Sequence, residues 1–336
     1  MRPRTIITGG AGFIGSHLAE RLAAAGHDLV LIDDLSTGRR ENVAHLLGPG
    51  CELVEARAAE AAADGRLFDD ADRVFHLAAA VGVKLVVDDP SAMIRTNIDE
   101  TDAVLHAALR TGAAVLVASS SEVYGKCPVL PLREDMELVY GPTTASRWSY
   151  GLTKALDEHL ALDLARRHGL RSVVARLFNT IGPRQVGRYG MVVPRFVAQA
   201  AAGRDLTLYG DGRQTRAFCD VRDVAHALAE LLDQPEAYGR VFNVGSTRQV
   251  TIDGLADRVI DATEAAGGPR VGKRHLPYEA VYGEGFEDPP HRLPDVGRLT
   301  EAIGFRPAFA LEDTLAELAV AAHAAAAPTP GRGAAS

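Results

Sequence analysis

Residues 5–15 read TIITGGAGFIG, and this stretch decides the fold class. Its first four residues, Thr5 to Thr8, form an apolar run typical of a buried strand. Three glycines spaced three apart follow, and the segment from Gly15 to Ala25 has the pattern of an amphipathic helix. A glycine turn is common in ordinary tight loops, but between a strand and a helix it lets backbone N–H groups approach a pyrophosphate. The stretch therefore predicts a dinucleotide-binding loop that comprises Gly9, Gly12, Phe13, Ile14 and Gly15.

Strand-like apolar runs alternate with helix-like segments over much of the chain. The runs lie at 29–32, 74–77, 115–118, 172–177 and 241–244, and the helical segments at 91–111, 147–168 and 221–233. This alternation predicts an α/β fold, a Rossmann doubly wound parallel sheet. Gly- and Pro-rich segments after residue 180 predict a smaller, loop-rich C-terminal α/β lobe that covers the sheet.

The same pattern suggests the domain boundaries. We expect the Rossmann domain to comprise residues 1–178 together with 221–249, and the C-terminal lobe to comprise 179–220 and 250–322. The last residues, AAAAPTPGRGAAS, are of low complexity, so we expect residues 323–336 to form a disordered tail.

Composition excludes several classes of function. The net charge of -8 argues against nucleic acid as a partner, because such proteins carry a basic surface. Cys51, Cys127 and Cys219 lack the spacing of a metal site or a disulfide framework, which favours a cytoplasmic protein without a metal. No apolar run approaches the roughly 18 residues that cross a bilayer, so we expect no membrane partner.

Asp33 follows the second apolar run, about 20 residues beyond the glycine loop. A carboxylate at that strand end accepts hydrogen bonds from ribose hydroxyls and repels a 2′-phosphate. The cofactor is therefore predicted to be NAD rather than NADP. Asp34 is a second candidate for this contact, and a solvated turn residue is the alternative interpretation of it.

Tyr150 and Lys154 lie four residues apart in the stretch SYGLTK and hence on one face of a helix. A lysine ammonium, reinforced by an oxidised nicotinamide, lowers the pKa of a nearby phenol, so Tyr150 is predicted to act as a general base. Ser120, at the end of an apolar run, is predicted to hold the hydroxyl that is oxidised. A surface Tyr/Lys pair is the alternative, and the glycine loop upstream favours hydride transfer to NAD.

Motifs along nearly the whole chain resemble the extended short-chain dehydrogenase/reductase family, in particular its nucleotide-sugar epimerases, dehydratases and decarboxylases. These motifs are GGAGFIG, DDLSTG, HLAAAVGV, SSSEVYG, YGLTK, RLFNTIGPRQ, YGDGRQTRAFCDVRDV and FNVGS. The resemblance implies a Rossmann domain that holds NAD, with Leu77, Ala78 and Ala79 beside the cofactor. It also implies a C-terminal lobe that holds a UDP-sugar, with Asn179, Arg216 and Arg292 facing the diphosphate or the sugar.

Glu122, in the stretch SSSEVYGK, distinguishes the reactions of this family. Simple 4-epimerases generally lack an acid at this position, and 4,6-dehydratases carry an Asp-Glu pair, whereas Ser121-Glu122 resembles the decarboxylases of UDP-glucuronate. RWSY at 147–150, and YGEGFED at 282–288 followed by RLPD, resemble the same enzymes. The resemblance implies that Arg147, Asp288 and Arg292 bind the substrate, and that Ser121 and Glu122 act near the sugar's C5.

Oxidation of a glucuronate at its 4-hydroxyl gives a ketone β to the carboxylate, so CO2 can leave without a metal. We therefore predict an NAD-dependent UDP-glucuronate decarboxylase, a lyase that releases a UDP-pentose or its 4-keto form. A UDP-sugar 4-epimerase is the first alternative and a 4,6-dehydratase the second. A protein that binds NAD without catalysis is the alternative from a different class.

The resemblance also implies a homodimer. Family members often pair through two helices, which here correspond to 91–111 and 147–168. Ala103, Ala107 and Ala108 would permit close packing at such an interface.

Overall fold

A computed structural model describes residues 2–80, 89–187, 191–282 and 289–326. Its centre is a seven-stranded parallel sheet in the order β11-β6-β5-β4-β1-β2-β3. The strands are β1 (Arg4–Thr8), β2 (Asp28–Asp33), β3 (Cys51–Glu55), β4 (Arg73–His76), β5 (Ala114–Ser120), β6 (Ser172–Leu177) and β11 (Arg240–Val244). The strand order reverses beside β1, which is where ligands bind in open α/β sheets. The predicted Rossmann fold is confirmed.

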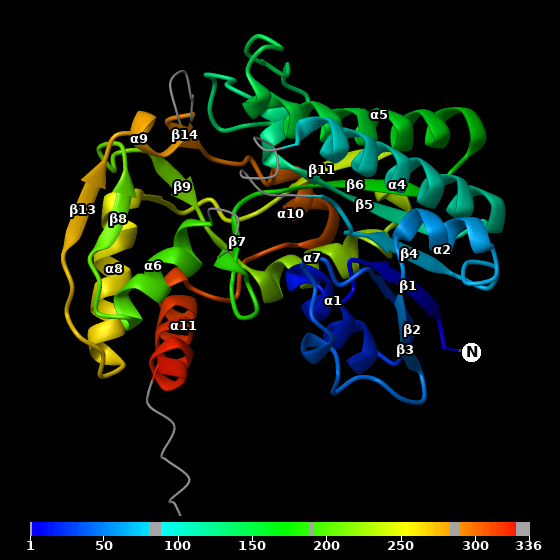
Figure 1. Ribbon diagram of the computed structural model, residues 1–336. Helices are drawn as coiled ribbons and strands as arrows, with labels where there is room; N and C mark the ends of the chain where they lie inside the picture. Colours follow the sequence, from blue (N-terminus) through cyan, green and yellow to red (C-terminus); the bar gives the residue numbers. More distant parts are fainter. Residues whose placement is uncertain (1, 81–88, 188–190, 283–288, 327–336) are drawn as a thin grey trace, which may run out of the picture.

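Helices cover both faces of this sheet (Figure 1). One face carries α2 (Ala58–Asp64), α4 (Pro90–Thr111) and α5 (Ser149–His168), and the other carries α1 (Phe13–Ala24) and α7 (Val221–Leu232). Alternate residues of each strand enter opposite cores, as Ile6 and Ile7 of β1 do, and both are fully buried. Burial on two sides explains why these strands read as continuous apolar runs.

The C-terminal lobe has its own core beside the carboxyl ends of the strands (Figure 1). Its helices are α6 (Val192–Ala201), α8 (Ile252–Ala265), α9 (Glu279–Tyr282), α10 (Gly297–Ile303) and α11 (Leu311–Ala326), of which α10 packs back on the Rossmann domain. Its strands are β7 (Thr180–Ile181), β8 (Leu206–Tyr209), β9 (Thr215–Ala217), β10 (Cys219–Asp220), β12 (Gln249–Thr251), β13 (Lys273–Leu276) and β14 (His291–Arg292). The domain boundaries given above stay a prediction.

Two short 3₁₀ helices lie next to the site. The helix η2 (Ser121–Tyr124) follows β5, and η3 (Ser146–Trp148) precedes α5.

Helix α11 continues to Ala326 and packs on α6 and α8. Residues 323–326, which we expected in the disordered tail, are therefore helical. Residues 327–336 lie outside the described part of the chain. No helix in that described part is long and apolar enough to cross a membrane.

Candidate active site

The glycine loop joins β1 to α1 with its backbone held close to β2. Gly9 has a φ of 68°, and the N–H of Gly9 donates to the carbonyl oxygen of Ile32 at 2.7 Å. A Cβ atom on Gly15 would lie 2.1 Å from the carbonyl oxygen of Gly9, so only glycine lets the helix begin this close to the turn. The helix starts at Phe13 and Ile14, whose backbone N–H groups belong to its open first turn. This arrangement fits the pyrophosphate of a dinucleotide.

Asp33 lies at the end of β2 and stabilises the glycine loop. Its side chain accepts hydrogen bonds from the N–H of Ala11 and the N–H of Leu35, each at 2.9 Å. Burial raises the pKa of this carboxyl above its ordinary value. Asp34 is exposed and accepts hydrogen bonds from the N–H and the hydroxyl of Ser36, so it serves the turn itself.

The segment after β4 lies against the glycine loop. The N–H of Leu77 donates to the carbonyl of Thr8, and a Cβ on Gly9 would lie 2.9 Å from the nitrogen of Ala78. The buried amide of Asn97, on α4, holds the next turn of this segment through two hydrogen bonds with the backbone of Ala80. Sequence analysis missed Asn97, although an amide on the apolar face of a helix was a usable signal. Leu77, Ala78 and Ala79 as cofactor contacts stay a prediction.

Tyr150 and Lys154 lie on the first turns of α5. The ammonium of Lys154 donates to Asp157 Oδ2 at 3.0 Å, and both side chains are almost completely buried. Burial raises the pKa of Tyr150 above its ordinary value and outweighs the lowering by Lys154 and by the hydrogen bond with Ser120. The lowering expected from Lys154 together with an oxidised nicotinamide stays a prediction. Among the protein groups alone, burial and the charge of Asp157 outweigh Lys154. Asp157, one turn beyond Lys154, was also missed.

Glu122 is held between two arginines from distant parts of the chain. Arg147 Nη1 donates to Glu122 Oε2 at 2.6 Å, and Arg292 Nη1 donates to Glu122 Oε1 at 2.6 Å. Arg292 also lies 3.4 Å from the hydroxyl of Ser121. Burial alone would raise the pKa of Glu122, but the two guanidinium groups hold it well below its usual range. Glu122 is thus a carboxylate that holds two cations in place.

Gly151 explains how Tyr150 comes to lie beside Glu122. A Cβ on Gly151 would lie 2.5 Å from the carbonyl oxygen of Glu122, so glycine allows α5 to pack on the backbone of η2. Trp148 is buried, and the Arg147 guanidinium lies 5.5 Å from the centre of its ring. Trp148 is therefore a core residue that also supports Arg147.

Other predicted substrate contacts lie on the lobe. Arg216 and Arg292 are register partners on the parallel strands β9 and β14, so they lie side by side, and both are buried. Arg216 donates to the carbonyl of Thr215 at 2.8 Å. Asn179 pairs through its carbonyl with the N–H of Cys219. Asp288 lies outside the described residues, and the contacts of these side chains with a substrate stay a prediction.

A buried asparagine joins the two halves of this site. Asn243 Oδ1 accepts a hydrogen bond of 2.7 Å from the hydroxyl of Tyr124, which lies two residues after Glu122. Asn243 Nδ2 donates to the carbonyls of Leu132 and Asp295, and the N–H of Asp295 donates to Leu132 as well. We call Tyr124, Leu132, Asn243 and Asp295 the Asn243 cluster. It connects η2, which carries Glu122, to the segment that follows Arg292.

No described group of three or more His, Cys, Asp or Glu side chains is arranged to hold a metal ion. The site therefore consists of a glycine loop, a Tyr/Lys pair and a carboxylate between two arginines.

Residues 5–245 match the model of the NAD dependent epimerase/dehydratase family. The chain belongs to this family. It is 39% identical, over 94% of its length and 97% of the relative, to UDP-N-acetyl-alpha-D-glucosaminuronate decarboxylase of Bacillus cytotoxicus. It is 34% identical, over 94% of its length and 70% of the relative, to UDP-glucuronic acid decarboxylase 1 of Xenopus tropicalis.

Solved structures of family members share the fold. UDP-N-acetylglucosamine 4-epimerase of Methanobrevibacter ruminantium superposes with a TM-score of 0.84 at 30% identity, covering 95% of this chain and 98% of that one. UDP-glucuronic acid 4-epimerase of Bacillus cereus, solved with UDP-glucuronic acid and NAD, gives a TM-score of 0.82 at 27% identity over 94% and 98% of the two chains. The protein is thus an enzyme of a family whose cofactor is NAD, as predicted.

We predict that Asp33→Ala weakens NAD binding and reduces the discrimination against NADP. The substitution removes the carboxylate that is predicted to accept hydrogen bonds from the ribose. It also removes the hydrogen bond from the N–H of Ala11, which supports the glycine loop. Fluorescence titration with each cofactor measures the two affinities. Asp34→Ala is the matched control and should leave both affinities near those of the wild type; an unchanged cofactor preference in Asp33→Ala would place the ribose contact elsewhere.

We predict that Tyr124→Phe lowers the free energy of unfolding by about 1–3 kcal/mol, because it leaves Asn243 Oδ1 buried without its donor. Urea denaturation measures the change. Tyr238→Phe is the control, since the Tyr238 hydroxyl is half-buried and its bond to Leu232 is 3.3 Å long. Equal losses of unfolding free energy in the two variants would show that the bond from Tyr124 to Asn243 contributes no more to stability than the bond of Tyr238.

Proposed function

We propose that the protein catalyses NAD-dependent oxidative decarboxylation of a UDP-hexuronate. The observation that carries this proposal is Glu122 between Arg147 and Arg292, beside the Tyr150/Lys154 pair. Cationic groups that already bind one carboxylate are suited to bind that of a sugar acid. The decarboxylases among the relatives support the same reading.

The substrate class follows from the charges and from the names of those relatives. The relative from Bacillus cytotoxicus acts on the 2-acetamido sugar, and the one from Xenopus tropicalis on UDP-glucuronic acid. We propose a UDP-sugar with a C6 carboxylate, either UDP-glucuronate or its 2-acetamido counterpart. Arg216, beside Arg292 on the neighbouring strand, and Asn179 would face the diphosphate.

The first step is oxidation at C4. The glycine loop and Asp33 would hold NAD, which would supply the hydride acceptor for C4 and the hydride donor for a later return. Tyr150 takes the proton of the 4-hydroxyl, and Ser120, already hydrogen-bonded to the phenol, orients that hydroxyl. Lys154 stabilises the phenolate through its charge, and Asp157 fixes the position of the ammonium.

The second step is loss of CO2 from the β-keto acid. The bond between C5 and C6 breaks, its electron pair moves into the enolate at C4–C5, and a proton is then delivered to C5. Arg147 and Arg292 would orient the carboxylate out of the plane of the ketone. Glu122 and Ser121 lie beside them and would position C5 or deliver the proton.

A 4-epimerase is the second candidate, because solved epimerases superpose on the whole chain. Epimerisation needs the same oxidation, then rotation of the keto sugar and return of the hydride to C4. It leaves no task for a partly buried glutamate that holds two arginines, which is why decarboxylation is preferred.

We also propose that the enzyme is a cytoplasmic homodimer. All three cysteines are free thiols, as expected in a reducing compartment. Leu152 and Leu156 project one turn apart from α5 and are 37% and 48% exposed, which suits a contact with a second copy. The expectation that Ala107 and Ala108 lie at this interface is wrong. Both residues are fully buried on the side of α4 that packs against the sheet.

Incubation with NAD and each sugar nucleotide, followed by mass spectrometry and proton NMR, tests the reaction. Loss of CO2 from either substrate with formation of a UDP-pentose or its 4-keto form supports the proposal. A product of unchanged mass that is epimerised at C4 would contradict decarboxylation and identify an epimerase.

We predict that Glu122→Gln reduces CO2 release by roughly two orders of magnitude or more. NAD affinity should stay unchanged, because the glycine loop lies on other strands. Glu137→Gln, the same chemical change at an exposed position, is the control. A variant that decarboxylates at the wild-type rate would remove the role given to Glu122.

We predict that Leu156→Glu converts the dimer to a monomer, because it places a charge in the proposed contact. Size-exclusion chromatography with light scattering measures the mass. Val320→Glu is the control, since Val320 is 58% exposed on α11. A wild-type protein that is monomeric would contradict the proposal directly.

A further inference from the structure

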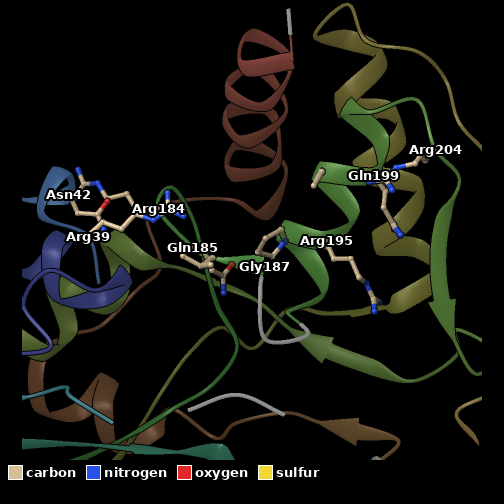
Figure 2. Close-up of a pocket in the computed structure, with 11 residues that line it drawn as sticks. Arg39, Asn42, Arg184, Gln185, Gly187, Arg195, Gln199 and Arg204 are labelled. Atoms are coloured by element: carbon tan, nitrogen blue, oxygen red, sulfur yellow. The ribbon is translucent and has the colours of Figure 1, made fainter. Parts of the chain in front are cut away.

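A basic cavity of about 540 Å³ lies between the Rossmann domain and the C-terminal lobe. Figure 2 shows Arg39 and Asn42 on the Rossmann side, and Arg195, Gln199 and Arg204 across the cavity on α6 and just beyond it. Arg184 and Gln185 lie on the segment that crosses between the two sides. None of the described residues that line it is assigned above to the cofactor, the sugar or the reaction.

The cavity carries charge of one sign. Four of its described lining residues are arginines and none is acidic, although the chain as a whole has a net charge of -8. Glu20, behind the lining, pairs with Arg184 and offsets part of that charge. No described acidic side chain forms an ion pair with Arg39 or Arg204. A concave surface lined by one sign of charge concentrates ions of the opposite sign.

Arg195 is held in place on the lobe side of the cavity by residues of β8. The guanidinium of Arg195 lies 3.9 Å from the ring centre of Tyr209, and its Nη2 donates to the carbonyl of Thr207. These contacts fix the position of Arg195 before any ligand arrives.

Asn42, Gln185 and Gln199 are already fixed on the cavity wall by hydrogen bonds. Asn42 Nδ2 and the N–H of Arg39 both donate to the carbonyl of Ala11 in the glycine loop. Gln185 Nε2 donates to the carbonyl of Thr180, and Gln199 forms two hydrogen bonds with Thr207. A ligand here would not have to order these groups, which favours binding.

We propose that this cavity is a second anion site that binds a phosphate-bearing molecule of nucleotide size. Its volume lies within the range of about 300–1,000 Å³ that is usual for small-molecule sites and exceeds what a lone phosphate needs. Arginines supply the paired donors that phosphate oxygens accept. A ligand there touches both lobes and contacts the residues that support the glycine loop. This site is separate from the proposed substrate and cofactor sites.

Calorimetric titration with ADP, in the presence of saturating NAD and UDP, tests the proposal. Those two ligands occupy the cofactor and substrate sites, so remaining saturable binding of one ADP per chain supports a second site. Adenosine, which lacks phosphate, should not bind under the same conditions. Loss of all ADP binding once NAD and UDP are present, or equal binding of adenosine, would overturn the proposal.

The variant Arg39→Gln/Arg204→Gln should bind ADP roughly tenfold more weakly or worse, because it removes two charge-assisted contacts. Arg166→Gln/Arg270→Gln is the matched control, since it removes two exposed arginines outside the cavity. Its ADP affinity should equal that of the wild type. Equal weakening in both double variants would mean that ADP responds only to net charge, which would also overturn the assignment.

Discussion

The pairing of Glu122 with Arg147 and Arg292 is the interaction on which the site depends. It joins the end of β5, the entry to α5 and strand β14 of the lobe, and its two contacts are each 2.6 Å long. A partly buried carboxylate needs such partners, because an unpaired charge away from water costs several kcal/mol. In the proposed reaction, Arg147 and Arg292 would meet the carboxylate of the substrate already oriented and partly desolvated by Glu122.

Buried polar contacts behind this pair fix its geometry. The Asn243 cluster ties η2 to the segment that follows Arg292, and Asn243 itself is fully buried. A second buried contact lies close by, where Arg176 pairs with Glu158 and its guanidinium stacks on the ring of Tyr124. Networks of this kind give a site one conformation, since every partner has a defined direction. These contacts thereby fix the position of the segment after Arg292 relative to η2 and Glu122.

The groups around Tyr150 determine the pKa of its phenol. Burial raises the pKa of the phenol, and Lys154 lowers it only in part because Asp157 shares the lysine charge. His76, buried at the end of β4 beside Thr8 and Thr101, has its pKa lowered to about 3 by burial and by Lys154, so it stays neutral. The protein groups alone therefore keep the phenol protonated, and Lys154 is the only buried cation that the described part of α5 places beside it.

The sequence by itself determined the strands and helices of the Rossmann domain, the glycine loop and the Tyr/Lys pair, because each depends on residues close together in the chain, and it determined the NAD-binding family through several such local motifs. Periodicity and spacing report local structure directly. Only the tertiary structure decided which arginines meet Glu122, since Arg147 and Arg292 lie 25 and 170 residues away from it. It also decided that Ala107 and Ala108 pack inward and that Asn97, Gly151 and Asn243 support the site. Contacts across the fold depend on packing, and no local pattern in the chain specifies them.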